Sequence, residues 1–106
     1  MSDTWGALAQ DVPAATTLTD VYEVPADQRG TVQVVACNRG STAVIRLSHA
    51  ISGAADSDEQ YLLFDLSLAG GETRVTSKFI VGAGDILRAY SDTGDVAFNI
   101  NGIIEE

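Results

Sequence analysis

The sequence has few of the residues on which small secreted domains and metal sites depend. It holds one cysteine, Cys37, and one histidine, His49, among 106 residues. A single cysteine permits no internal disulfide, and one cysteine with one histidine supplies too few soft ligands for a structural zinc site. We therefore expect no bound metal and no other cofactor, and a fold that is stabilised by packing.

Basic residues are also few. Six lysines and arginines stand against fifteen aspartates and glutamates, which gives a formal net charge of −9 and an isoelectric point near 4.2. A field of this sign repels phosphate backbones, and no two basic residues are adjacent in the chain. The composition therefore argues against nucleic acid as a partner.

Long hydrophobic runs are absent. No apolar stretch approaches the length of a membrane span, and the first residues lack the basic and apolar segments of a secretory signal. We expect no membrane association and a chain made in the cytoplasm. A chain of 106 residues, 45% of them hydrophobic, is long enough to form one domain with its own core.

Short β-like runs are plentiful. From residue 17 onward, β-branched and aromatic residues stand between turns of glycine, asparagine, aspartate and proline, and no segment repeats the helical period. These features predict an all-β fold, an antiparallel β-sandwich of about seven strands, of which a jelly roll is one arrangement. The expected strands are 17–24, 31–38, 42–51, 60–68, 73–81, 86–91 and 96–104.

The first residues differ from the rest. Residues 1–16 follow neither the strand nor the helix period, so we expect a flexible N-terminal arm, with residues 17–106 as the sandwich domain. The one tryptophan, Trp5, lies in this arm. It is either a ring on the domain's own surface or an anchor on a neighbouring subunit, and the sequence leaves both interpretations open.

The connections carry turn signals. The short, glycine-containing links are expected to form hairpins, and the longer link 52–59 is expected to cross between sheets. Cys37 lies at the end of the second run, where Asn38 and Gly40 are expected to turn the chain into a hairpin. We interpret its thiol as a small buried group and disfavour a reactive thiol beside Arg39.

Catalytic signatures are weak. His49 would need a partner such as Ser48, Ser52 or Ser91, and no Gly-x-Ser-x-Gly occurs in the chain. A lone histidine on a strand is more typical of a surface or edge position. We therefore predict no catalytic residue and a protein that is not an enzyme.

An acidic loop offers oxygen ligands. Asp56, Asp58 and Glu59 are close in sequence, but the glycine and the final glutamate of a calcium loop are missing. A solvated acidic loop is therefore the favoured interpretation, with no residue assigned as a metal ligand.

Five segments carry a resemblance to a known family: "VYEVPA", "CNRGST", "YLLFDL", "GDILRAYS" and "VAFNING". Together they resemble small β-sandwich structural proteins of the virions of tailed bacteriophages. The resemblance covers nearly all of the chain after residue 16. It implies a non-enzymatic structural protein that is located in the virion and made in the host cytoplasm.

The position in the particle is a further inference. An acidic sandwich with apolar residues on both faces of several strands favours a capsid decoration (cement) protein on the outer surface, away from packaged DNA. Its expected partners are other copies of itself, as a trimer, and the major capsid protein or other virion proteins. On this interpretation the partner-binding residues are Trp5 and Leu8 of the arm.

Two alternatives stay open. One is a neck, tail or baseplate component. The other is a host-attachment or carbohydrate-binding module, because β-sandwiches often bind sugars by stacking them on exposed aromatic rings. All the aromatic residues except Trp5 lie inside strand runs, where we expect them to face the core.

Overall fold

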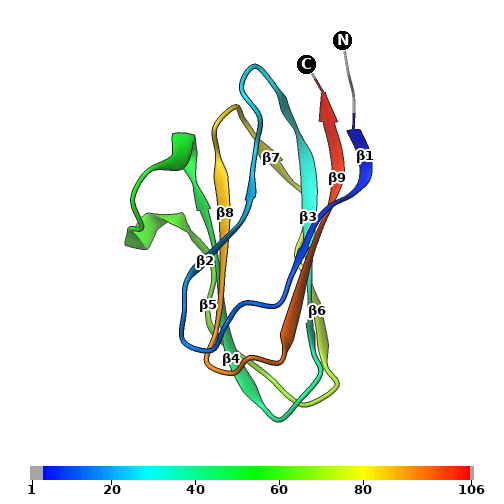
Figure 1. Cartoon of the computed structure of the whole chain (residues 1–106), viewed down its shortest axis with the longest axis vertical. Coiled ribbons are helices and arrows are strands. Elements are labelled where there is room, and N and C mark those ends of the chain that lie inside the picture. Colours follow the sequence, from blue (N-terminus) through cyan, green and yellow to red (C-terminus); the bar gives the residue numbers. More distant parts are fainter. Residues whose placement is uncertain (1–3, 106) are drawn as a thin grey trace.

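A computed structural model of the protein describes residues 4–105. These residues form two packed antiparallel sheets (Figure 1), so the predicted all-β sandwich is confirmed. None of their helices is long and apolar enough to cross a bilayer. The strands are β1 (Thr4–Asp11), β2 (Thr19–Glu23), β3 (Arg29–Asn38), β4 (Ala43–Ala50), β5 (Tyr61–Leu68), β6 (Thr73–Val75), β7 (Phe79–Val81), β8 (Ile86–Ser91) and β9 (Val96–Glu105), with the 3-10 helices η1 (Ile51–Gly53) and η2 (Asp58–Gln60) between β4 and β5.

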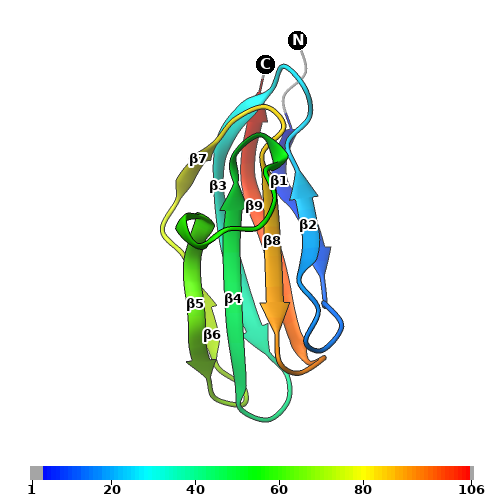
Figure 2. The same cartoon turned by 90° about the vertical axis from the view of Figure 1, so that its left-hand side faces the viewer.

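The strand order is that of a jelly roll. Sheet A has the order β1-β9-β3, with β6 and β7 both paired to the far side of β3, and sheet B has the order β2-β8-β4-β5 (Figure 2). The pairs β1·β9, β2·β8, β3·β6/β7 and β4·β5 are those of one long hairpin folded upon itself. The sequence had left this arrangement open.

The core lies between the two sheets. Inward-facing residues alternate with outward-facing ones along the long strands, as the period of a β-strand requires. The alternation of β9 places four apolar residues on the core face, where each is at most 1% exposed: Val96, Phe98, Ile100 and Ile104.

The connections differ from the prediction. The short links 39–42, 69–72, 82–85 and 92–95 each join a strand of one sheet to a strand of the other, so the expected hairpins are wrong. The link 51–60 joins β4 to β5 within sheet B, so the expected crossing is also wrong. Packed sheets are about 10 Å apart, a distance that four extended residues can span. A turn signal marks a reversal of the chain and does not identify the next sheet.

The predicted N-terminal arm is wrong for the residues that the structure describes. Thr4–Asp11 form β1 and pair with β9, so they belong to the sandwich, while residues 1–3 lie outside the described part. The register shifts between Ala7 and Ala9, a bulge that breaks the period-2 pattern. Backbone pairing with β9 holds the strand although several of its side chains are small and its apolar residues are irregularly spaced.

The predicted strand 73–81 is interrupted. Thr76 leaves the ladder between β6 and β7, and its hydroxyl accepts a hydrogen bond from the Val34 amide at 3.0 Å while its own amide donates to the Val34 carbonyl at 2.9 Å. The interruption turns Val75 outward, where it is 49% exposed, whereas Phe79 packs against the core. A period of two would place Val75 and Phe79 on one face, and the interruption at Thr76 puts them on opposite faces.

The links 39–42 and 69–72 lie at the lower end of the sandwich in Figure 1, and a buried asparagine contacts both. The side-chain amide of Asn38 donates to the carbonyls of Ser41 at 2.7 Å and Leu68 at 3.0 Å, and its oxygen accepts from the Gly40 amide at 3.0 Å. These partners, together with the carbonyl of Ala69 at 3.3 Å, belong to the two links 39–42 and 69–72 and to the end of β5. Asn38 is fully buried and ties both links together.

Replacing Asn38 with alanine should strongly destabilise the protein. The substitution leaves buried carbonyl and amide groups without partners, each costing about 1–3 kcal/mol. We expect the free energy of unfolding in urea to fall by about 3 kcal/mol or more, against about 0.5 kcal/mol for the control Asn99→Ala on the outer face of sheet A. Equal losses for the two variants would contradict the role of Asn38.

Candidate functional site

The outer face of sheet A carries a line of exposed apolar side chains. The register places Trp5 beside Ile103, Ile103 beside Thr31, and Thr31 beside Ile80 on four neighbouring strands. Trp5 is 72% exposed, Ile80 75% and Ile103 38%. We call Trp5, Ile103 and Ile80 the apolar row. Trp5 therefore does not plug the domain's own surface, and its ring is free to contact another molecule.

A hollow of about 580 Å³ adjoins the apolar row. Gly6 and Gly102, which face each other in the register, form part of its lining. A side chain at Gly102 would overlap the carbonyl oxygen of Thr31, and its φ of 152° also favours glycine. The close approach of β3 and β9 thus keeps the surface beside the row concave.

The two residues predicted to bind a partner lie in different environments. Trp5 is part of the apolar row, but Leu8 is half-buried and packs against the core, because it lies at the bulge between Ala7 and Ala9. Sequence reasoning missed Ile80 and Ile103. The alternation of β9 was a usable signal for Ile103, since its neighbour Ile104 faces inward.

The outer face of sheet B holds a stacked arginine. The guanidinium of Arg46 lies 4.4 Å from the ring centroid of Phe64 and 4.8 Å from that of Tyr90, and its Nε donates to Asp65 at 2.6 Å. This hydrogen bond raises the pKa of Arg46. A register shift opposite Arg46 brings Phe64 and Asp65 against one side chain.

The aromatic residues were only partly predicted. Phe98 is buried in the core as expected, but Phe64 is 58% exposed and stacks on the outer face of sheet B. Tyr61 pairs in register with Ser48 of β4 and meets Phe64 edge-on at 5.1 Å. Aromatic residues in strands therefore line an outer surface here as well as the core.

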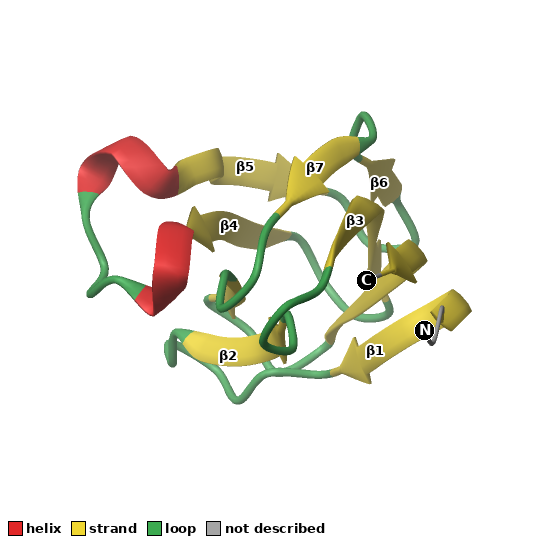
Figure 3. Cartoon of the chain, turned by 90° about the horizontal axis from the view of Figure 1, so that it is seen from above, coloured by secondary structure: helices red, strands yellow, loops and turns green. Residues whose placement is uncertain are grey.

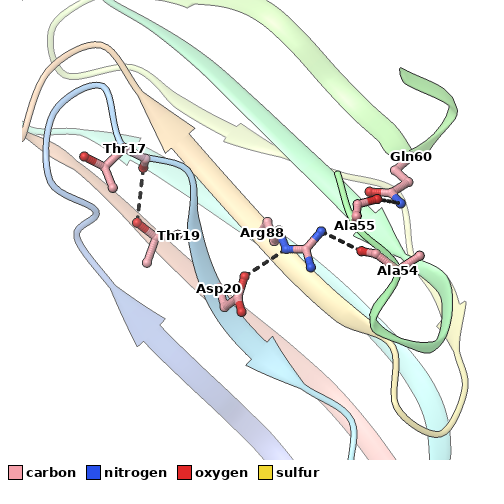
Figure 4. A network of polar contacts seen from close by, with 7 residues as sticks. All are labelled: Thr17, Thr19, Asp20, Ala54, Ala55, Gln60 and Arg88. Carbon is pink, nitrogen blue, oxygen red and sulfur yellow. Dashed lines mark hydrogen bonds and ion pairs between the residues drawn. The ribbon is translucent and has the colours of Figure 1, made fainter. Parts of the chain in front are cut away.

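The link 51–60, which we call the tip loop, is held over sheet B (Figure 4). Arg88 donates to Asp20 of β2 at 2.8 Å and to the carbonyl of Ala54 at 3.0 Å, and Gln60 donates to the carbonyl of Ala55 at 2.8 Å. The side chain of Arg88, a residue of β8, is only 12% exposed. The loop is thereby anchored at its middle.

The acidic residues of the tip loop point to solvent. Asp56, Asp58 and Glu59 are exposed, and the Ser57 hydroxyl donates to Glu59 at 2.7 Å, which lowers the pKa of Glu59. Within residues 4–105, no three His, Cys, Asp or Glu side chains gather as metal ligands would. Asp58, Tyr61 and Phe64 line a second hollow of about 430 Å³.

His49 is paired with an aspartate. Its Nε2 lies 2.7 Å from Oδ2 of Asp85, and its ring lies 5.7 Å from the Phe79 ring, so the expectation of a surface or edge histidine is wrong. The Ser52 amide donates to the same carboxylate, but in the described chain no serine hydroxyl hydrogen-bonds the imidazole. The residues of a catalytic triad are therefore not brought together.

Cys37 faces outward. It lies on the outer face of sheet A between Ala97 and Thr73 in register and is half-buried, whereas its neighbours Ala36 and Asn38 point inward. The interpretation of Cys37 as a core residue in a hairpin is therefore wrong. Strand alternation from Ala36 was the signal that favoured the outer face.

Comparisons of the chain with protein families, with curated proteins and with solved structures gave no match. A functional assignment therefore rests on the surfaces described above.

The link 82–85, at the upper end of the sandwich in Figure 1, ends in the buried Asp85. Burial opposes ionisation of its carboxyl, but hydrogen bonds from the amides of Gly82 and Ser52 and from His49 outweigh burial and lower the pKa of Asp85. The backbone of Asp85 also binds the Val24 amide at 2.9 Å. One residue thus joins β2, β4 and the link 82–85.

Replacing Asp85 with asparagine should make the free energy of unfolding less dependent on pH. Because the folded pKa is lowered, the ionised carboxyl stabilises the fold above about pH 4, and this contribution is lost as the pH falls through the folded pKa. We expect urea unfolding to show a loss of about 2 kcal/mol at pH 7 that shrinks below pH 4. The control Asp27→Asn alters an exposed residue and should change the free energy of unfolding little. A loss in Asp85→Asn that does not depend on pH would contradict the role of the charge.

Proposed function

We propose that this chain is a structural protein of a tailed-bacteriophage virion, a capsid decoration protein that covers the outer surface of the particle. The observation that carries the proposal is the apolar row of Trp5, Ile103 and Ile80. These side chains lie on neighbouring strands of a rigid sheet and become buried when the subunit packs on the shell or on a neighbouring copy.

The physical argument starts from solvation. Exposed aromatic and aliphatic side chains that line up on one face are typical of an interaction surface, because their removal from water is favourable by about 25 cal/mol per Å². Trp5 on an edge strand offers the kind of residue that anchors protein interfaces. The concave surface beside the row accommodates an apolar knob of the partner.

Fold and charge are compatible with this role. Jelly rolls recur in viral capsid proteins, an analogy that raises the probability of a particle protein without identifying one. A net charge of −9 disfavours contact with packaged DNA and suits the outside of a shell.

The position in the particle is tested by quantitative mass spectrometry of purified virions that encode the chain. Decoration requires a copy number comparable to that of the major capsid protein. A few copies per particle would instead support the neck, tail or baseplate alternative, and absence from the particle would refute a virion role.

Weakening the apolar row should weaken attachment. We expect the double variant Trp5→Ser/Ile80→Ser to fold normally and to bind particles lacking the protein with an affinity lower by on the order of tenfold or more. Binding is measured by co-sedimentation and folding by thermal melting. Val12→Ser, which alters an exposed apolar residue outside the row, is the matched control, and equal binding by the two variants would count against the row.

A second candidate function is supported by the hollow of Asp58, Tyr61 and Phe64 on sheet B. Exposed aromatic rings beside a carboxylate suit a neutral sugar, whose C–H face stacks on a ring and whose hydroxyls donate to the acid. Binding on a glycan array that is lost in Phe64→Ala and kept in Trp5→Ser would support this candidate. An array without any bound glycan would dismiss it.

A further inference from the structure

A groove runs along the open edge of the sandwich. It lies between β5 and the segment 74–79, and its volume is about 380 Å³. Leu62 is 45% exposed and Val75 49% exposed in its lining, and Phe79 contributes apolar surface that also touches the core. Because β5 lies at the end of the strand order of sheet B, its outer edge has no neighbouring strand among residues 4–105.

Two cations line this groove. Arg74 and Lys78 make no ion pair with any residue in the described range, whereas Arg46 and Arg88 on sheet B are each paired with an aspartate. Lys78 also lines the hollow beside the apolar row, so this residue borders both. The groove is therefore apolar in its lining and positively charged.

The tip loop has the complementary character. It exposes the acidic side chains of Asp56, Asp58 and Glu59, and Ile51 at its start is 69% exposed. In Figure 3 the short helices of this loop project away from β1 and the C-terminal end of sheet A. A loop that projects with acidic and apolar groups matches a groove with cations and apolar lining.

We propose that the groove binds the tip loop of a second copy of this chain. The contact joins two different surfaces, so each copy presents a free groove and a free loop, and repetition closes a ring when the rotation between copies permits it. This inference rests on the self-association in the proposed function and identifies the surfaces that meet. Opposite charges fix the register of the contact although each subunit carries a net negative charge.

The chain offers a selective chemical test, because Lys78 is its one lysine. A zero-length carbodiimide joins a lysine amine to a carboxylate only when the two groups touch. Full-length protein is mixed from ¹⁵N-labelled and unlabelled batches, cross-linked both free and bound to particles, and digested for mass spectrometry. Mixed-isotope peptides that join Lys78 to Asp56, Asp58 or Glu59 are the expected result. Their absence from both samples overturns the proposal.

Charge reversal supplies an independent measurement. Arg74→Glu/Lys78→Glu reverses the groove and Asp56→Lys/Asp58→Lys reverses the loop, and each pair should raise the dissociation constant between copies on the order of tenfold. The fourfold variant again joins opposite charges and should return to within about threefold of the original protein. Arg29→Glu, which alters another arginine without an ion pair among residues 4–105, is the control. If the fourfold variant associates as weakly as the two double variants, the assignment of the loop is overturned.

The two proposals fail in different ways. If Trp5→Ser/Ile80→Ser weakens particle binding while the cross-link and the charge reversals give no effect, the groove assignment is wrong and decoration stands. If the cross-link forms but the protein is absent from virions, self-association through the groove stands and decoration is wrong.

Discussion

Hydrogen bonds from two buried side chains hold the two sheets together at their ends. Links that cross between sheets after a few residues carry amides and carbonyls away from water, and each such group must find a partner. Asn38 supplies partners at one end and Asp85 at the other. The two residues thereby satisfy backbone groups of the links at the two ends of the sandwich.

Much of the fold follows from local patterns. Alternation of apolar and polar residues identified most strands, because the period of two is a property of a single strand. The pairing of strands is not local, and for that reason the links were assigned wrongly: Gly40 or Gly71 signals a reversal in either case. β1 escaped prediction because a bulge interrupts its alternation and small residues replace branched ones.

The candidate site was less predictable than the fold. Trp5 attracted notice as the one tryptophan, but its alignment with Ile103 and Ile80 depends on the pairing of strands far apart in sequence. The stack on Arg46 likewise requires the register shift opposite it. Acidic residues outnumber basic ones in the composition, so the composition does not reveal that Arg74 and Lys78 lack ion-pair partners among residues 4–105.

The position of β9 bears on how the protein is made. This strand follows all the others in the chain, yet it lies between β1 and β3 and pairs with both. During synthesis, β1 therefore has no partner strand in sheet A until β9 has left the ribosome, and before then β3 can pair only on the side of β6 and β7. The apolar row is not aligned during that period, because Ile103 lies on β9 and because β9 is the strand that holds Trp5 of β1 next to β3.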